Sequence, residues 1–385
     1  MSLSSKLPQV GTTIFTTMSR LAQEENAINL AQGFPGFGSD PVLLELVAKY
    51  TRGGFNQYAP MSGVSELKQA LATKTQRTQG YFPDSEWEVT IVSGATEALF
   101  AAFTAVVHPG DEVIVLEPAY DSYVPAIALN GGIPVFVPLQ SPDFSVDWEL
   151  VGSKITSKTR AIVVNSPHNP SGYVWSQEDV NNLATMVTQH GLYVVSDEVY
   201  EHILFDGKSH ISLGSNAVLR DRTFLCGSFG KTFHVTGWKI GYCIAPKALS
   251  TEFRKVHQYL TFSTVTPIQY ALAEYLKDSE KYLGLPAFYQ KKRDLFLDGL
   301  AQTFLKFQPS QGSFFQLASY GHLSTKSDVL VAEQMTRILK VACIPVSVFY
   351  SDNKDLQVLR FCFAKEDAEL KEALDRIKNF DKILA

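Results

Sequence analysis

Between residues 87 and 246, short apolar runs alternate with amphipathic stretches. The apolar runs predict seven strands, at 89–92, 112–116, 133–137, 161–164, 192–196, 223–226 and 240–245. Near-continuous runs of valine and isoleucine are typical of parallel strands buried on both faces. The pattern therefore predicts an α/β fold, with a mostly parallel seven-stranded sheet covered by helices.

The flanking segments have a different pattern. Helices are predicted from residue 41 and over 63–78, after a loop-rich start with one strand at 28–32. Beyond residue 280, helices at 286–305, at 328–341 and from 365 alternate with strands at 312–317 and 358–363. Since 385 residues exceed what one core usually supports, we expect a large domain of residues 41–280. Residues 1–40 and 281–385 would form a small α+β domain.

Polar clusters follow five of the predicted strands directly, at residues 93–97, 118–120, 165–170, 197–200 and 227–231. In an open parallel sheet, ligands bind outside the carboxyl ends of the strands. The five clusters therefore predict one ligand site at that edge.

Lys231 lies between small residues in the segment TFLCGSFGKTFHVTGWKIGYCIAP, residues 223–246. A lysine whose ammonium form is disfavoured reacts with aldehydes to give a Schiff base. An aldehyde cofactor such as pyridoxal 5′-phosphate needs five more features. These are an acid at its ring nitrogen, donors to its phenolate oxygen, an aromatic face, a phosphate cradle and a clamp for the substrate carboxylate. The alternative is that Lys231 and Lys239 are ordinary loop lysines.

Four residues are candidates for the polar roles in such a site, and each of them also has a purely structural interpretation. Asp197 follows a buried strand and suits the ring nitrogen, but it equally suits a helix N-cap. Asn169 and Tyr200 are candidate donors to the phenolate oxygen, or else a turn asparagine and a core tyrosine. Arg360 lies in an apolar strand and needs an anionic partner. That partner is either a substrate carboxylate or an internal carboxylate.

Residues 93–97 open a helix, whose free N–H groups and positive dipole end suit a phosphate. A plain capping arrangement is the alternative. Ser228 and Lys239 are candidates to complete the cradle. Tyr120 or Tyr123 supplies a flat aromatic face, or belongs to the core.

Composition narrows the function classes. With 34 basic and 39 acidic residues the net charge is −5, and no charge run suggests nucleic-acid or membrane partners. The four cysteines lie in apolar runs without a CxxC pair, which predicts buried thiols in a reduced, cytoplasmic setting. No P-loop, HExxH or GxSxG motif and no cluster of metal ligands is present, so no metal is expected. The scattered histidines, His257 among them, are interpreted as structural.

Five motifs together resemble the class I/II aminotransferases of the fold-type I pyridoxal-phosphate superfamily, from end to end of the chain: SGATEAL, NSPHNPSG, SDEVYEH, GSFGKTFHVTGWKIGY and LRFCFAK. Four more segments are most similar to the methionine and kynurenine–glutamine branch: GTTIF, NQYAPMSG, EPAYDSY and HQYLTFSTVTP. The resemblance implies pyridoxal 5′-phosphate as cofactor. It also implies ping-pong transfer of the amino group from a hydrophobic, thioether or aromatic L-amino acid, with methionine favoured, to a 2-oxo acid.

The resemblance also implies a role for each matching residue. Lys231 would form the Schiff base and shuttle the proton, Asp197 would pair with the ring nitrogen, and Tyr120 would stack. Asn169 and Tyr200 would hold the phenolate oxygen. The cradle would comprise Gly94, Ala95, Thr96, Ser228 and Lys239, together with Tyr58 from the partner of a homodimer. Substrate would contact Gly33, Asn165, Arg360 and Phe262.

Two positions depart from the family pattern. Gly36 stands where an acidic residue is usual, and Ser263 stands where kynurenine aminotransferases carry a histidine. No arginine is evident for a second carboxylate, so aspartate is not a favoured donor. Three alternatives remain: a cysteine-S-conjugate β-lyase, a kynurenine-type aminotransferase, and a catalytically silent cofactor-binding regulator.

Overall fold

The computed structural model describes residues 4–8 and 10–383, so both ends of the predicted small domain extend outside the described residues. Its largest sheet has the strand order β2-β8-β7-β6-β5-β3-β4. The strands are β2 (Val89–Val92), β3 (Glu112–Glu117), β4 (Ile133–Pro138), β5 (Thr159–Asn165), β6 (Tyr193–Asp197), β7 (Thr223–Ser228) and β8 (Gly241–Ile244). Only β8 runs antiparallel to its neighbours. The predicted mostly parallel, seven-stranded sheet is confirmed.

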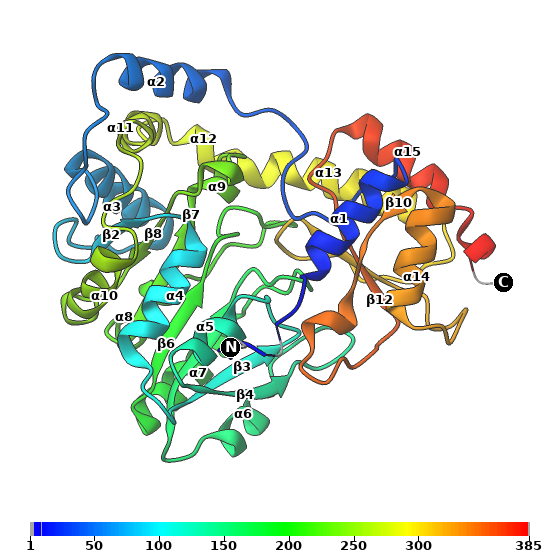
Figure 1. The fold of residues 1–385 in the computed structure, drawn as a ribbon, viewed down its shortest axis with the longest axis horizontal. Helices are drawn as coiled ribbons and strands as arrows, with labels where there is room; N and C mark the ends of the chain where they lie inside the picture. The colour runs from blue at the N-terminus through cyan, green and yellow to red at the C-terminus, as the bar shows by residue number, and fades with distance from the viewer. Residues whose placement is uncertain (1–3, 9, 384–385) are drawn as a thin grey trace.

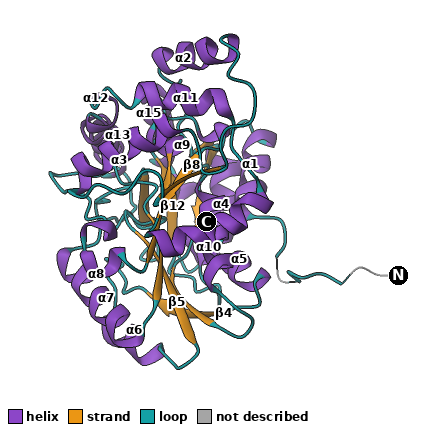
Figure 2. Cartoon of the chain, turned by 90° about the vertical axis from the view of Figure 1, so that its left-hand side faces the viewer, coloured by secondary structure: helices purple, strands orange, loops and turns teal. Residues whose placement is uncertain are grey.

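Side-chain alternation along the strands produces two cores, one on each face of this sheet. Val113 and Val115 pack with helices α4 (Ala95–Val106), α5 (Tyr123–Leu129) and α10 (Lys247–Leu260). Ile114 and Leu116 face the other core, with α3 (Ser65–Gln79) and α7 (Gln177–His190). Figure 2 shows the sheet between these two groups of helices. Because both faces are covered, only the strand ends are open to a ligand.

A second, three-stranded sheet has the order β11-β12-β9. Its strands are β9 (Phe315–Ser319), β11 (Ile344–Pro345) and β12 (Val358–Cys362). The short strand β1 (Ile28–Asn29) pairs in parallel with β10 (Val341–Ala342), which joins the N-terminal segment to the C-terminal part of the chain. Figure 1 shows α1 (Ile14–Glu24, blue) lying beside these C-terminal elements.

The remaining helices are α2 (Pro41–Arg52), α6 (Trp148–Lys154), α8 (Ala217–Arg220), α9 (Phe229–Thr232), α11 (Thr266–Tyr275), α12 (Glu280–Leu283), α13 (Leu285–Leu300), α14 (Asp328–Gln334) and α15 (Asp367–Ile377). Several predicted boundaries differ: the helix predicted over 286–305 ends at Leu300, and the strand predicted at 28–32 ends at Asn29. The strand predicted at 312–317 begins only at Phe315, because Ser313 has a φ of 63°, outside the extended region. The helix predicted over 328–341 changes to a π-helical turn at Met335–Leu339. All four cysteines are buried and free, as predicted.

None of the helices within residues 4–8 and 10–383 is long and apolar enough to cross a membrane.

A buried ion pair joins α3 to the turn that follows β6. Lys74 Nζ lies 2.5 Å from Glu201 Oε1, and both side chains are almost fully buried. The hydroxyl of Tyr242 also donates to Glu201, as does Gln79 Nε2 at 2.9 Å. Burial opposes ionisation of Glu201, but the Lys74 ammonium outweighs it and holds the pKa of that carboxyl below its ordinary value. This pair fixes the segment directly after Tyr200.

The substitution Lys74→Met should lower the free energy of unfolding by about 3–5 kcal/mol, because it leaves the buried Glu201 carboxylate without its compensating positive charge. Urea unfolding of the cofactor-free protein measures this change. The matched control Lys49→Met removes an exposed pair with Glu274 and should leave the unfolding midpoint unchanged. Equal effects of the two substitutions would contradict the importance of the buried pair.

Candidate active site

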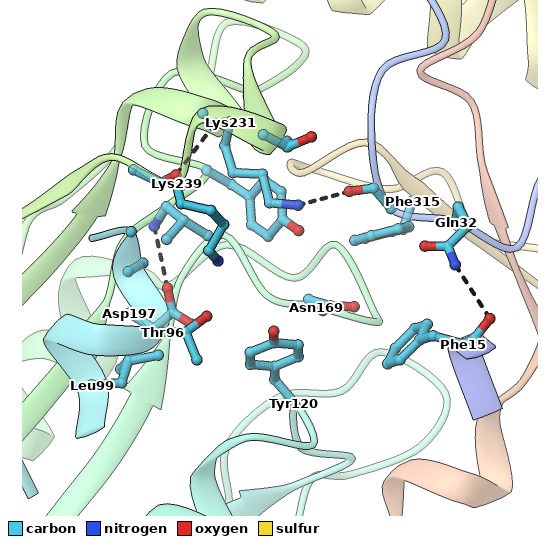
Figure 3. A pocket seen from close by; sticks show the side chains of 18 of the residues that line it. Phe15, Gln32, Thr96, Leu99, Tyr120, Asn169, Asp197, Lys231, Lys239 and Phe315 are labelled. Carbon is cyan, nitrogen blue, oxygen red and sulfur yellow. Dashed lines mark hydrogen bonds between the residues drawn. The ribbon is translucent and has the colours of Figure 1, made fainter. Parts of the chain in front are cut away.

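A cavity of about 310 Å³ lies at the carboxyl ends of β5, β6 and β7, facing β9 and β12. All but three of the residues predicted for the site line it: Gly33, Gly94, Ala95, Thr96, Tyr120, Asn169, Asp197, Tyr200, Ser228, Lys231, Lys239 and Arg360. Figure 3 shows how Lys231, Lys239, Thr96, Asp197, Asn169 and Tyr120 surround this space. The predicted convergence of polar clusters on one sheet edge is confirmed.

Strand register explains part of this convergence. Asn165 is paired with Asp197, and Asp197 is paired with Cys226 on β7. The last residues of β5 and β6 therefore lie level with Cys226, two residues before the end of β7. Asn169 follows β5 by four residues, and Lys231 follows the end of β7 by three. Short connections thus carry both side chains into the cavity.

Lys231 lies in the first turn of α9, where the Ser228 hydroxyl caps the helix by accepting from the Lys231 backbone N–H at 3.3 Å. Its Nζ donates to the carbonyl oxygen of Gly33 at 2.7 Å. Burial disfavours the ammonium form and lowers the pKa of Lys231 to about 8. A neutral amine is the nucleophilic form, so this lysine is suited to react with a carbonyl group near neutral pH.

Asp197 ends β6 and is almost fully buried. Burial raises the pKa of its carboxyl group to about 6, while the hydroxyl of Tyr123, which donates to Oδ2 at 2.7 Å, opposes the rise. The Val199 N–H donates weakly to Oδ1 at 3.4 Å. Tyr123 does not line the cavity, whereas Tyr120 does. Of the two tyrosines considered for the flat face, only Tyr120 is therefore available.

The N-terminus of α4 opens into the cavity at Gly94, Ala95 and Thr96. Gly94 has a φ of 82°, and no side chain caps the helix, so its first N–H groups are left for a ligand. A Cβ added at Gly94 would lie 3.3 Å from Lys239 Nζ, which places that ammonium over the same turn. Backbone donors, a helix N-terminus and an ammonium group form an anion-binding arrangement.

Arg360 is fully buried on β12. Its guanidinium donates to Asn169 Oδ1 and to the Ala31 carbonyl, both at 2.8 Å, and lies 4.0 Å from the ring centre of Phe315. Within the described residues its guanidinium bonds only to these amide and carbonyl oxygens and has no ion pair, and its Nε has no hydrogen-bond partner. Burial lowers the pKa of Arg360 to about 10. The internal salt bridge considered above is not found there, and the charge still needs an anion.

Three predicted residues lie elsewhere. Asn165 is buried behind the cavity, where it donates to the Asp197 carbonyl at 2.8 Å and accepts from the Asn169 N–H at 2.7 Å. Tyr58 is 84% exposed, and its ring contacts that of Phe262 at 5.3 Å on the outer surface. Asn165 thus orients two cavity residues, and Tyr58 and Phe262 lie outside the cavity of their own chain.

Eight further lining residues were not predicted: Phe15, Gln32, Leu99, Val199, Gly230, Thr236, Ile240 and Phe315. Phe15 is on α1 and Phe315 on β9, and each looks like an ordinary member of an amphipathic or apolar segment. No local signal in the sequence distinguishes the side chains of Phe15 and Phe315 from those of core residues. Within the part of the chain that the structure describes, no cluster of side chains could hold a metal ion.

Comparison with known proteins places the chain in a family. The model of the family "Aminotransferase class I and II" matches residues 25–377. The chain therefore belongs to the class I/II aminotransferases and is an enzyme of that class, as its motifs indicated. The family works with pyridoxal phosphate and transfers amino groups between amino acids and oxo acids.

Individual relatives are similar over nearly their whole length. The chain is 49% identical to the methionine aminotransferase of Escherichia coli K12, over 97% of each chain. It is 34% identical to a kynurenine–oxoglutarate transaminase of Dictyostelium discoideum, over 98% of this chain and 96% of that one. A crystal structure of the E. coli methionine aminotransferase covers 98% of this chain and 100% of its own, with a TM-score of 0.96.

The cavity residues fit pyridoxal phosphate. An anion cradle at α4, a lysine of lowered pKa and a buried carboxylate are the three fixed points that its phosphate, aldehyde and ring nitrogen require. Gly94 matters because a side chain there would crowd Lys239 over the cradle.

We expect Tyr123→Phe to raise the pKa of Asp197 above its value of about 6, since a hydrogen bond to the ionised carboxylate is lost. The infrared band of the protonated carboxyl group, followed against pH in the cofactor-free protein and assigned with Asp197→Asn, measures the shift. Tyr193→Phe, on the same strand, serves as the control. An unchanged titration in Tyr123→Phe would mean that this hydrogen bond does not govern Asp197.

Proposed function

We propose that this aminotransferase binds pyridoxal 5′-phosphate in the cavity and that methionine is its preferred amino donor. One observation carries the proposal: a fully buried Arg360, without an anionic partner among residues 4–8 and 10–383, faces the same cavity as Lys231, whose pKa is lowered to about 8. A substrate with one carboxylate and one amino group satisfies both. The 49% identity to a methionine aminotransferase supports the choice of donor.

When bound, the cofactor supplies an aldehyde that takes up the amino group and a ring that withdraws electrons from the substrate Cα. The carboxylate of Asp197 accepts a hydrogen bond from the ring nitrogen and so stabilises its protonated form. Asn169 uses its Oδ1 to hold Arg360, so its amide Nδ2 remains as a donor to the phenolate oxygen. Tyr200 supplies the second donor to that oxygen.

Lys231 Nζ is the group that moves protons. Its lowered pKa makes the amine neutral in part near neutral pH, so it can take a proton from Cα of the amino donor in the first half-reaction and, once protonated, give a proton to Cα of the oxo acid in the second. Arg360 orients the substrate through its carboxylate. The ring of Phe315 stacks on the guanidinium and keeps its plane fixed.

The side-chain pocket favours monocarboxylic donors. The cations that line the cavity are Lys231, Lys239 and Arg360, and the proposal assigns one role to each. None is left for a second carboxylate, which matches the expectation that aspartate is not preferred. The half-buried ring of Phe15 and that of Phe315 provide an apolar wall suited to a thioether.

The exposed Tyr58 supports a homodimer in which this residue reaches the phosphate in the partner's site. Phe262, in contact with Tyr58, would reach the partner's substrate in the same way. The pairing of β1 with β10 supports the proposed division into residues 41–280 and a small domain of 1–40 with 281–385. The cytoplasmic location stays a prediction.

A kynurenine-type activity is the second candidate, because relatives named kynurenine–oxoglutarate transaminase are 32–35% identical to this chain. Ser263, in place of a histidine, argues against it as the main activity. β-Elimination from cysteine S-conjugates uses the same residues, and release of pyruvate and ammonia would reveal it. The silent regulator is disfavoured by the filled catalytic positions.

Methionine, added to the cofactor-loaded enzyme without an oxo acid, should bleach the visible band and release one equivalent of its oxo acid per site. The absorption spectrum and an assay of the oxo acid measure both. Lys231→Ala should still bind the cofactor but give no product. If the visible band persists with methionine yet bleaches with kynurenine, the donor assignment is wrong; if no band forms with added cofactor, the function itself is wrong.

Arg360→Met should raise KM for methionine about 100-fold, since a charge-assisted contact worth about 3 kcal/mol is lost. Cofactor affinity should change little, because the arginine lies on the substrate side. Arg360→Lys keeps the charge but loses the two-pronged geometry, so its KM for methionine should lie between those of the wild type and of Arg360→Met. Steady-state kinetics and a cofactor titration measure the two effects. Equal loss of cofactor and substrate affinity would contradict the clamp.

A further inference from the structure

His257 is a fully buried histidine on α10 that the reaction described above does not use. Its Nδ1 lies 2.5 Å from Glu97 Oε1, and its Nε2 lies 2.9 Å from the Met61 carbonyl oxygen. The other carboxylate oxygen of Glu97 accepts from the backbone N–H of Ser93. One chain of hydrogen bonds therefore runs from Ser93, beside the anion cradle, through Glu97 and His257 to Met61.

The partners of the ring determine where its hydrogens lie. A carbonyl oxygen can only accept, so His257 Nε2 must carry a hydrogen. Glu97, when ionised, can also only accept, so Nδ1 then carries the second hydrogen and the ring is positively charged. With Glu97 ionised, the pair is a buried carboxylate beside a compensating imidazolium, and each polar atom in it has a partner.

The negative charge of Glu97 needs a compensating positive charge because Glu97 lies next to the anion cradle. It occupies the first turn of α4, directly after the cradle residues Ala95 and Thr96 that line the cavity. An uncompensated buried carboxylate at that position would repel a phosphate through a medium of low dielectric constant. His257 removes that repulsion while its bonds hold the start of the helix.

The other contacts of His257 reach the residues proposed to enter the partner's site. Met61 is three residues from Tyr58, and the His257 backbone carbonyl accepts from the N–H of both Thr261 and Phe262. The rings of Tyr58 and Phe262 touch each other at the surface. His257 therefore contacts, through one side chain and one carbonyl group, the two segments that carry these exposed rings.

We propose that His257 is a positioning residue that, with Glu97, couples the phosphate cradle of its own chain to the Tyr58–Phe262 pair offered to the other chain. The inference rests on the proposed function, in which Tyr58 completes the partner's site. In a homodimer each His257 then acts on two sites: in its own chain through Glu97, and in the partner through Met61 and Phe262.

The action on its own chain is tested by cofactor and phosphate binding. His257→Leu should weaken the binding of pyridoxal phosphate, and of inorganic phosphate to the cofactor-free protein, by about tenfold or more, because Glu97 is left uncompensated. Glu97→Gln/His257→Leu, which removes the charge as well, should recover most of the inorganic phosphate affinity. Equal losses in the single and double variants would overturn the electrostatic part of the proposal.

The action on the partner is tested in mixed dimers, purified with two different tags. One chain is wild type, and the other carries Lys231→Ala together with His257→Leu. The Schiff base with Lys231 then forms only in the wild-type chain, so its absorption band reports the wild-type site, whose cradle is intact but whose neighbour lacks His257. Cofactor release from that site should be about fivefold faster than in a mixed dimer whose second chain carries Lys231→Ala alone.

Phe253→Leu is the matched control for general loosening of α10, because Phe253 is fully buried on the same helix but is not among the partners of Glu97 or Met61. Placed in the Lys231→Ala chain, it should leave release from the wild-type site unchanged. The coupling would be overturned if the cofactor left the wild-type site at the same rate in all three mixed dimers. It would also be overturned if Phe253→Leu sped up this release as much as His257→Leu does. Failure of the proposed function is seen separately, because the wild-type dimer would then not bleach with methionine.

Discussion

The parallel register of β5, β6 and β7 is the constraint on which the rest of the site depends. It sets Asn165, Asp197 and Cys226 at one level, so that the loops beyond them start from a common edge. Asn169 and Lys231 reach the cavity only because their connections from that edge are short. A shift of one strand by one residue would reverse the faces of its side chains and displace the segment that follows it along the sheet edge.

The edge of the sheet supplies one half of the cavity, and the small sheet supplies the other. Arg360 and Phe315 come from paired strands, β12 and β9, and Gly33 comes from the segment after β1. The cavity therefore holds three cations and one buried carboxylate, drawn from opposite sides. Without a ligand, this set of charges destabilises the folded protein, because the guanidinium of Arg360 has no anion beside it within the described residues. The surrounding ion pairs, such as Lys74 with Glu201, hold the backbone that carries it.

Much of the fold and of the site followed from local patterns. The seven strands, the polar clusters and the motif residues around Lys231 and Asp197 could be predicted, because each is encoded within a few neighbouring positions. Phe15 and Gln32 could not, since their part in the cavity depends on how the N-terminal segment lies against β12. Tyr123 was a candidate for the stacking face, and only the structure shows that it lies outside the cavity that Tyr120 lines, with its hydroxyl on Asp197.

By itself, the sequence determined the α/β class, the order of the strands along the chain and the chemistry of the polar clusters, because hydrophobic period and residue type are local properties. Tertiary structure alone decided that Arg360 has no counter-ion in the described part of the chain, that Asn165 lies behind the cavity, and that His257 connects Glu97 to Met61. Those outcomes depend on contacts between residues far apart in the chain, for which the local sequence carries no signal.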